Sequence, residues 1–270
     1  EDVLTCLEQV VALAAQPSYS QGQQFLSRAP VLSLLRTERG AWNLRRPWDP
    51  TFQTMAVAKN SQLSAAAPPK QPSIHPSCVI DPSASIHASV VIGPFTVIGT
   101  GVVLAADCVV ASHCVIDEAS RVGTGCQIGK GSHVDGGSTL GAHNTLHPLV
   151  SITGGSSIGT HNTFHSGATV GSRGEWKGGM TPSGVVVIGC RNVFRENAVV
   201  HRPFTRRETR IGSGCYVMHG VTIAHDVFVD DCVQIAPHCV LAGYCNIFRG
   251  CFLGLQSSYH QFTTVGAYSM

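Results

Sequence analysis

The sequence IHPSCVIDPSASIHASVVIGPFTVIGTGVVL, residues 74–104, has a large aliphatic residue at every sixth position. The spacing continues without a break to Val170, and it is the period of neither an α-helix nor a single strand. A fixed short period indicates a repeat architecture. The positions of this first run are Ile74, Ile80, Ile86, Ile92, Ile98, Leu104, Val110, Ile116, Val122, Ile128, Val134, Leu140, Leu146, Ile152, Ile158, Phe164 and Val170.

The other positions of the hexapeptide are patterned as well. The residue after the aliphatic one is often Gly, Asp or His, and the fourth residue after it is small or slender, as in Cys78, Ala84 and Val90. This pattern predicts a short strand and a corner in each hexapeptide, so that three hexapeptides form an 18-residue coil. The aliphatic side chains point inward, and successive coils stack at about 4.8 Å, the spacing of paired strands.

The six-residue period survives two interruptions. It returns at Ile188 and again in a run from Ile211 to Val265, which brings the total to about thirty hexapeptides, or about ten coils. The sequence therefore predicts an all-β fold, a parallel β-helix over residues 71–270. We expect loop excursions at 171–187 and 201–210, where charged residues interrupt the repeat.

Composition agrees with a solenoid. Charged residues make up 13% of the 270 residues, and the 29 glycines suit its corners. The net charge of +2 argues against a nucleic-acid partner, and no apolar run is long enough for a transmembrane segment. Eight of the 11 cysteines occupy the small-residue position, which favours packing over disulfides or metal binding and indicates a reducing, intracellular compartment.

Residues 1–70 lack the repeat. Apolar spacing predicts a short amphipathic α-helix over 1–16 and a second over 22–37, followed by a Ser/Ala/Pro/Lys-rich linker. We expect this arm to connect the solenoid to a larger protein assembly. The chain begins with Glu1, which suggests either a fragment or removal of a targeting segment, and the latter would place the protein in an organelle.

His225 is the candidate for acid–base chemistry, because an imidazole accepts a proton near neutral pH. Asp226 is the nearest carboxylate that could orient it, although neighbouring side chains in a strand point to opposite faces. Eighteen and 36 residues further on lie Gly243, beside Tyr244, and Gln261, beside His260. The repeat therefore predicts His225, Tyr244 and His260 on one edge of the solenoid.

Several short stretches carry a family resemblance from about Ile74 to Met270. The chain resembles the UDP-N-acetylglucosamine O-acyltransferases of lipid A biosynthesis, which are hexapeptide-repeat proteins. The stretches that carry the resemblance are Ile92–Phe95, Arg191–Glu196, Val200–Arg202, Ala224–Asp226, Leu241–Gly243, His260–Phe262 and Val265–Ala267.

The resemblance implies a left-handed β-helix and a homotrimer with sites between subunits. It implies transfer of a 3-hydroxyacyl group from acyl carrier protein to the 3-hydroxyl of UDP-N-acetylglucosamine, with no metal or other cofactor. It assigns His225 as the general base and Asp226 as its supporting carboxylate. The residues that it places at the substrate site are His260, Gln261, Tyr244, Glu175, Lys177, His201 and Arg202, of which Glu175 and Lys177 need a one-residue shift to align.

Two alternatives stay open at this stage. Tyr244 stands where the family has a histidine, and the sequence stops at Met270 where the family continues with a helical domain, so a non-catalytic structural subunit fits as well. The second alternative is a protein like the γ-class carbonic anhydrases, with zinc held by histidines. His219 and His225 are six residues apart, on successive faces, with no third ligand evident.

Overall fold

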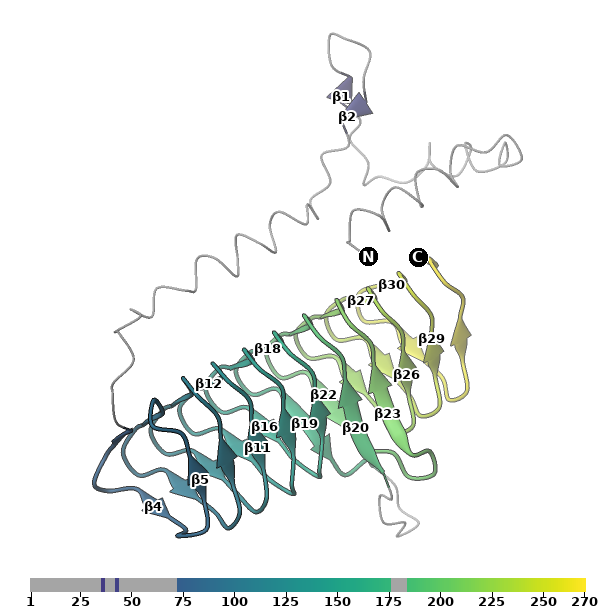
Figure 1. Cartoon of the computed structure of the whole chain (residues 1–270). Coiled ribbons are helices and arrows are strands. Elements are labelled where there is room, and N and C mark those ends of the chain that lie inside the picture. The colour runs from purple at the N-terminus through teal and green to yellow at the C-terminus, as the bar shows by residue number, and fades with distance from the viewer. Residues whose placement is uncertain (1–34, 37–41, 44–71, 176–183) are drawn as a thin grey trace. The chain divides into compact units, whose positions relative to one another are not determined.

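The structure is a computed structural model that describes residues 35–36, 42–43, 72–175 and 184–270 (Figure 1). The chain divides into two compact units, 1–66 and 67–270. In the first, the described residues form an antiparallel pair of short strands, β1 (Leu35–Arg36) and β2 (Trp42–Asn43). The helix predicted over 1–16 lies outside the described residues. The one predicted over 22–37 is wrong at its end, because Leu35 and Arg36 form the strand β1, paired with β2. No described helix is long and apolar enough to cross a membrane.

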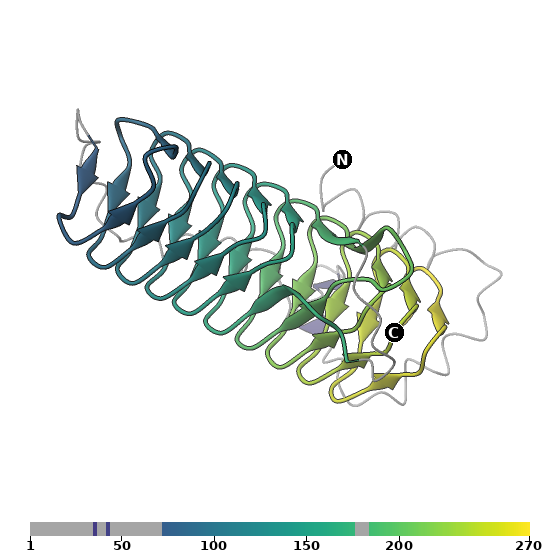
Figure 2. The same ribbon diagram turned by 90° about the horizontal axis from the view of Figure 1, so that it is seen from below.

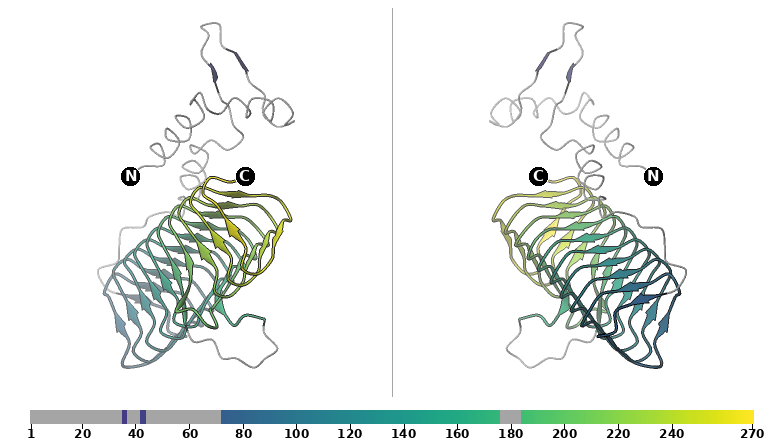
Figure 3. Two further views of the ribbon diagram at one scale, coloured as in Figure 1. Left: turned by 90° about the vertical axis from the view of Figure 1, so that its right-hand side faces the viewer. Right: turned by 90° about the vertical axis from the view of Figure 1, so that its left-hand side faces the viewer.

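The second unit is the predicted β-helix of ten coils, a left-handed parallel β-helix, with three parallel sheets of ten strands each (Figures 1 and 2). Sheet I contains β3 (Ser73–Ile74), β6 (Val91–Ile92), β9 (Val109–Val110), β12 (Gln127–Ile128), β15 (Thr145–Leu146), β18 (Thr163–Phe164), β21 (Val193–Phe194), β24 (Tyr216–Val217), β27 (Gln234–Ile235) and β30 (Phe252–Leu253). Sheet II contains β4 (Val79–Ile80), β7 (Val97–Ile98), β10 (Val115–Ile116), β13 (His133–Val134), β16 (Ser151–Ile152), β19 (Thr169–Ser172), β22 (Val199–His201), β25 (Thr222–Ile223), β28 (Val240–Leu241) and β31 (Ser258–Tyr259). Sheet III contains β5 (Ser85–Ile86), β8 (Val103–Leu104), β11 (Arg121–Val122), β14 (Thr139–Leu140), β17 (Ser157–Ile158), β20 (Val185–Ile188), β23 (Glu208–Ile211), β26 (Phe228–Val229), β29 (Asn246–Ile247) and β32 (Thr264–Val265). The views of Figure 3 show the sheets as the sides of a three-sided coil.

Most strands have two residues, the first facing out and the second facing in. The inward residues are the aliphatic ones of the six-residue period, and in the interior coils they are at most 3% exposed, as at Ile158. This confirms the predicted period and its phase. Exposure rises in the terminal coils, to 37% at Ile74, because such a coil has a neighbour on one side only.

The small-residue position carries thiols that pack inside the corners. Cys108, Cys114 and Cys126 are free and fully buried, and each S–H donates to the carbonyl of the glycine 15 residues later, at 3.1 to 3.2 Å. Burial raises the pKa of Cys108 to about 11 and that of Cys215 to about 12, so both stay protonated. These cysteines are packing residues, as the repeat predicts.

A buried amide ladder takes over the same position in the middle of the stack. Asn144, Asn162 and Asn192 are fully buried and bond to one another through side-chain amides at 3.0 Å, with further bonds to corner carbonyls. Beside them the rings of Phe164 and Phe194 stack at 4.8 Å. Satisfied amides inside a dry core hold neighbouring coils in one register.

The two predicted excursions leave the solenoid at neighbouring coils. Ile158 pairs with Ile188, 30 residues later instead of 18, and Ile188 pairs with Ile211, 23 residues later. Both insertions extend the strands beside them: β19, β20 and β23 have four residues each, and β22 has three. Both insertions therefore lie at the same corner of the β-helix. One connects β19 of sheet II to β20 of sheet III, and the other connects β22 to β23.

Candidate functional site

The candidate site lies at the corner that follows the strands of sheet II. His225 comes two residues after β25, and its side chain is 6% exposed although it sits at the edge of the coil. Tyr244 occupies the same corner one coil later, and the His225 and Tyr244 rings meet edge to face at 5.4 Å. The repeat alone therefore placed these two rings correctly on one edge.

Asp226 is hydrogen-bonded to His225, with 2.8 Å between Oδ2 and Nδ1. Strand alternation would separate adjacent side chains, but Asp226 is a corner residue with a φ of 61°, in the left-handed region. This backbone turn brings its carboxylate round to the imidazole. A carboxylate accepts hydrogen bonds, so it fixes the proton of neutral His225 on Nδ1 and leaves Nε2 as the basic nitrogen.

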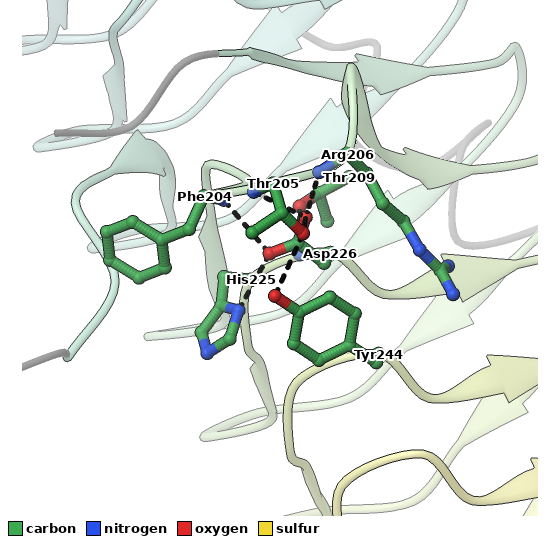
Figure 4. A network of polar contacts seen from close by, with 7 residues as sticks. All are labelled: Phe204, Thr205, Arg206, Thr209, His225, Asp226 and Tyr244. Atoms are coloured by element: carbon green, nitrogen blue, oxygen red, sulfur yellow. Dashed lines mark hydrogen bonds and ion pairs between the residues drawn. The ribbon is translucent and has the colours of Figure 1, made fainter. Parts of the chain in front are cut away.

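The same carboxylate organises the second excursion (Figure 4). Its oxygens accept hydrogen bonds from the backbone N–H of Phe204 at 2.9 Å, Thr205 at 3.0 Å and Arg206, and the Thr209 hydroxyl accepts the Asp226 N–H at 2.9 Å. Burial raises the pKa of Asp226, but the hydrogen bonds from Arg206, Phe204 and His225 outweigh it and lower the pKa below its ordinary value. Asp226 is thus a fully buried carboxylate that remains ionised.

The imidazole of His225 has a fitted cavity. A Cβ at Gly243 would lie 2.5 Å from Cε1 and 2.8 Å from Nε2 of His225, so only glycine at position 243 leaves room for the ring. The Phe204 ring packs edge-on against His225 at 4.8 Å, and Gly174 lies close to both. The ring is therefore held in one orientation by its neighbours as well as by Asp226.

Tyr244 belongs to a second layer of the site. Its hydroxyl lies 2.9 Å from the Thr205 hydroxyl, which in turn lies 3.3 Å from Asp226 Oδ1 (Figure 4). The ring stacks on Phe262 at 4.8 Å, and the Arg206 guanidinium lies over it at 5.7 Å. A tyrosine here connects the carboxylate of one coil to the corner of the next.

The other predicted residues lie at varying distance along this corner. His260 and Gln261 are exposed, two coils beyond His225, and Glu175 is exposed at the edge of the first excursion. Lys177 lies outside the described residues. The sequence analysis assigned no site role to Phe204, Thr205 or Gly243. Of these three, only Gly243 could have been found from the repeat, because a glycine 18 residues after His225 leaves space for the imidazole ring.

His201 and Arg202 lie at this corner one coil before His225. His201 is 9% exposed, and burial lowers its pKa, so it is neutral at pH 7. His201 Nδ1 and Arg202 Nε are buried and have no hydrogen-bond partner among the described residues. Buried polar atoms are usually satisfied, so these two are candidates for contact with a ligand.

The two histidines considered for zinc belong to different corners. His219 packs edge to face against His238 at 4.9 Å, at the corner that follows sheet I, whereas His225 follows sheet II. Within the described residues, no three His, Cys, Asp or Glu side chains are grouped to hold a metal ion. One chain therefore does not bring His219 and His225 to the same ion.

The fold and this corner define a class: a hexapeptide-repeat β-helix protein with a buried histidine–carboxylate pair between two excursions. Residues 69–168 match the family model described as the GMPPB C-terminal domain. Relatives over a similar length are acyl-[acyl-carrier-protein]–UDP-N-acetylglucosamine O-acyltransferases. That of Aliivibrio fischeri is 40% identical over 86 residues, 31% of this chain and 33% of the relative, and that of Herminiimonas arsenicoxydans is 38% identical over 85 residues, 31% and 32%.

These relatives confirm the resemblance to the UDP-N-acetylglucosamine O-acyltransferase family, and the chain spans about a third of their length. Among solved structures, the UDP-N-acetylglucosamine acyltransferase of Francisella novicida has 24% identity and a TM-score of 0.45, covering 72% of this chain and 59% of its own. The Arabidopsis enzyme has 24% identity and a TM-score of 0.43, covering 72% and 63%.

Proposed function

We propose that this protein is an O-acyltransferase that moves a 3-hydroxyacyl group from acyl carrier protein to the 3-hydroxyl of UDP-N-acetylglucosamine. The observation that carries the proposal is the 2.8 Å bond between His225 Nδ1 and the buried, ionised carboxylate of Asp226. That bond directs Nε2 to act as a base and stabilises the imidazolium that forms when it does. The names of the sequence relatives state acyl transfer from acyl carrier protein to UDP-N-acetylglucosamine, and they supply the substrate class.

The step balances with His225 alone as the proton carrier. Nε2 takes the proton of the sugar hydroxyl as its oxygen bonds to the carbonyl carbon of the thioester. The tetrahedral intermediate then loses the carrier's sulfur, which leaves as a thiolate and takes the proton back from Nε2. Asp226 stays ionised throughout, because its five hydrogen bonds from Phe204, Thr205, Arg206 and His225 favour the charged form.

Replacing His225 by Ala tests the proposal. We expect turnover with acyl carrier protein thioester and UDP-N-acetylglucosamine to fall by on the order of 10² to 10⁴, the usual contribution of a general base. The matched control is His238→Ala, which removes an exposed corner histidine at a different edge and leaves turnover unchanged. Acyl transfer by the His225→Ala protein at the wild-type rate would reject His225 as the base.

A non-catalytic structural subunit is the second candidate, and one observation favours it. Asp226 accepts three backbone N–H bonds from the turn at 204–206, so it has a structural task whether or not His225 moves a proton. On this view His225 and Asp226 have a structural role: Asp226 holds the excursion at 201–210 in one conformation for contact with other proteins. The wild-type protein would then show no turnover, and residues 1–70 would mediate the assembly.

A further inference from the structure

A groove lies along the sheet II corner in the coils that precede the His225 site. Its volume is about 410 Å³, and its walls come from the corners that follow β10, β13, β16 and β22. Gly136 and Gly154 form part of its floor, at a corner position where the preceding coil has Glu118. Neither corner has a side chain of its own, and the space above Gly154 holds the side chain of Arg202.

The two ends of the groove carry opposite charges. Asp117 and Glu118 line the end away from His225, Arg173 and Arg202 line the end nearest to it, and Asp135 lies between them, bonded to Gly154. Two of the acids are already engaged: Asp135 accepts the Gly154 N–H at 3.2 Å and lies 3.4 Å from His133, and Asp117 accepts the Glu118 N–H at 2.9 Å.

Within residues 72–175 and 184–270, the Arg202 guanidinium has no such partner. Its side chain lies across Gly154, where a Cβ would come within 2.5 Å of Cδ and 2.7 Å of Nε. Nε is buried and unsatisfied, and none of the ion pairs among the described residues includes this guanidinium. A buried N–H donor without an acceptor is costly, and the planar guanidinium fork matches a phosphate group.

We infer that this groove binds the phosphate of a phosphate-bearing substrate, with Arg202 as its direct ligand. The carboxylates at the far end repel an anion, so the phosphate sits at the Arg202 end and hydroxyl or amide N–H groups of the same molecule lie toward Glu118. Two substrates of the proposed reaction carry that chemistry: the diphosphate of the UDP-sugar and the phosphodiester of the carrier's pantetheine arm. The choice of these two substrates as the source of the phosphate rests on the proposed function. If the groove holds one of them, that substrate extends from His225 toward the lower-numbered coils.

Equilibrium binding to the full-length protein tests the inference without requiring turnover. The probes are UDP-N-acetylglucosamine, phosphopantetheine and uridine, which lacks phosphate, and calorimetry measures each dissociation constant. We expect Arg202→Ala to weaken binding of at least one phosphate-bearing probe by about tenfold or more, and Arg202→Lys to weaken it less. The probe that responds identifies the source of the phosphate.

Two further variants sharpen the test. Arg210→Ala removes an exposed arginine on sheet III that is paired with Glu208, and it leaves binding unchanged. Glu118→Gln removes an exposed negative charge from the groove and strengthens binding of the phosphate probe. Equal affinities for wild type and Arg202→Ala, or no binding of either phosphate probe by wild type, would overturn the inference. A wild type that binds phosphate but shows no turnover would reject the transferase and leave the groove assignment standing.

Discussion

At the scale of single residues, the site depends on a left-handed backbone conformation at Asp226, which the alternation of side chains along a strand does not predict. The repeat located His225 and Tyr244 on one edge, but strand alternation argued against a His225–Asp226 bond. The positive φ of Asp226 reverses that argument, since a left-handed corner turns the carboxylate toward its neighbour. The corner position of Asp226 in the repeat was visible in the sequence, whereas the three amides that converge on it come from an excursion with no repeat to place it.

The hydroxyl of Tyr244 provides a test of this second layer. Tyr244→Phe removes the contact with Thr205 and keeps the stack on Phe262, so the turn that supports Asp226 loses one anchor. We expect kcat to fall about three- to tenfold, which corresponds to the roughly 0.5–1.5 kcal/mol of one hydrogen bond. Tyr216→Phe is the matched control, because its hydroxyl bonds to Arg195 at another corner. Equal kcat values for the two variants would show that the Thr205 contact does not support catalysis.

At the scale of elements, each corner is a column of side chains that repeats from coil to coil. The column after sheet I stacks the rings of His147 and His165 at 4.6 Å, and Glu196, bonded to Arg195, lies 3.4 Å from His165. Burial is the main cause that lowers the pKa of His165 to about 4, with the neighbouring His147 and Arg195 acting in the same direction. This column was not predicted, because a period identifies which residues align but not which of them interact.

The lowered pKa of His165 predicts acid sensitivity. The folded protein binds fewer protons than the unfolded chain between pH 6.5 and about 4, so stability falls as the pH drops through that window. The contribution is about 1–2 kcal/mol after allowance for the one-fifth of the ring that is exposed. Urea unfolding at pH 7 and pH 5 measures it. His165→Phe keeps an aromatic ring in the stack and reduces the difference, whereas the exposed His87→Gln does not; a pH effect of the same size in all three proteins would contradict the assignment.

At the scale of the whole β-helix, the sequence period was enough to predict ten coils, the inward residues and the packing role of the cysteines. This success has a physical reason, since each coil contacts only its neighbours and the core is local. The excursions were located as breaks in the period, but their conformation depends on bonds to Asp226 and to neighbouring strands that no local pattern encodes. Residues 1–70 carry no repeat, and their predicted role in assembly remains a prediction.

The central claim is that this solenoid transfers an acyl group to a sugar nucleotide, and product analysis tests it most directly. The purified protein is incubated with a 3-hydroxyacyl thioester of acyl carrier protein and UDP-N-acetylglucosamine, and the nucleotide product is analysed by mass spectrometry with fragmentation. We predict a UDP-sugar that has gained one 3-hydroxyacyl group as an ester at the 3-hydroxyl, formed by wild type and nearly absent with His225→Ala. Unchanged UDP-N-acetylglucosamine after incubation with the wild-type protein would contradict the account.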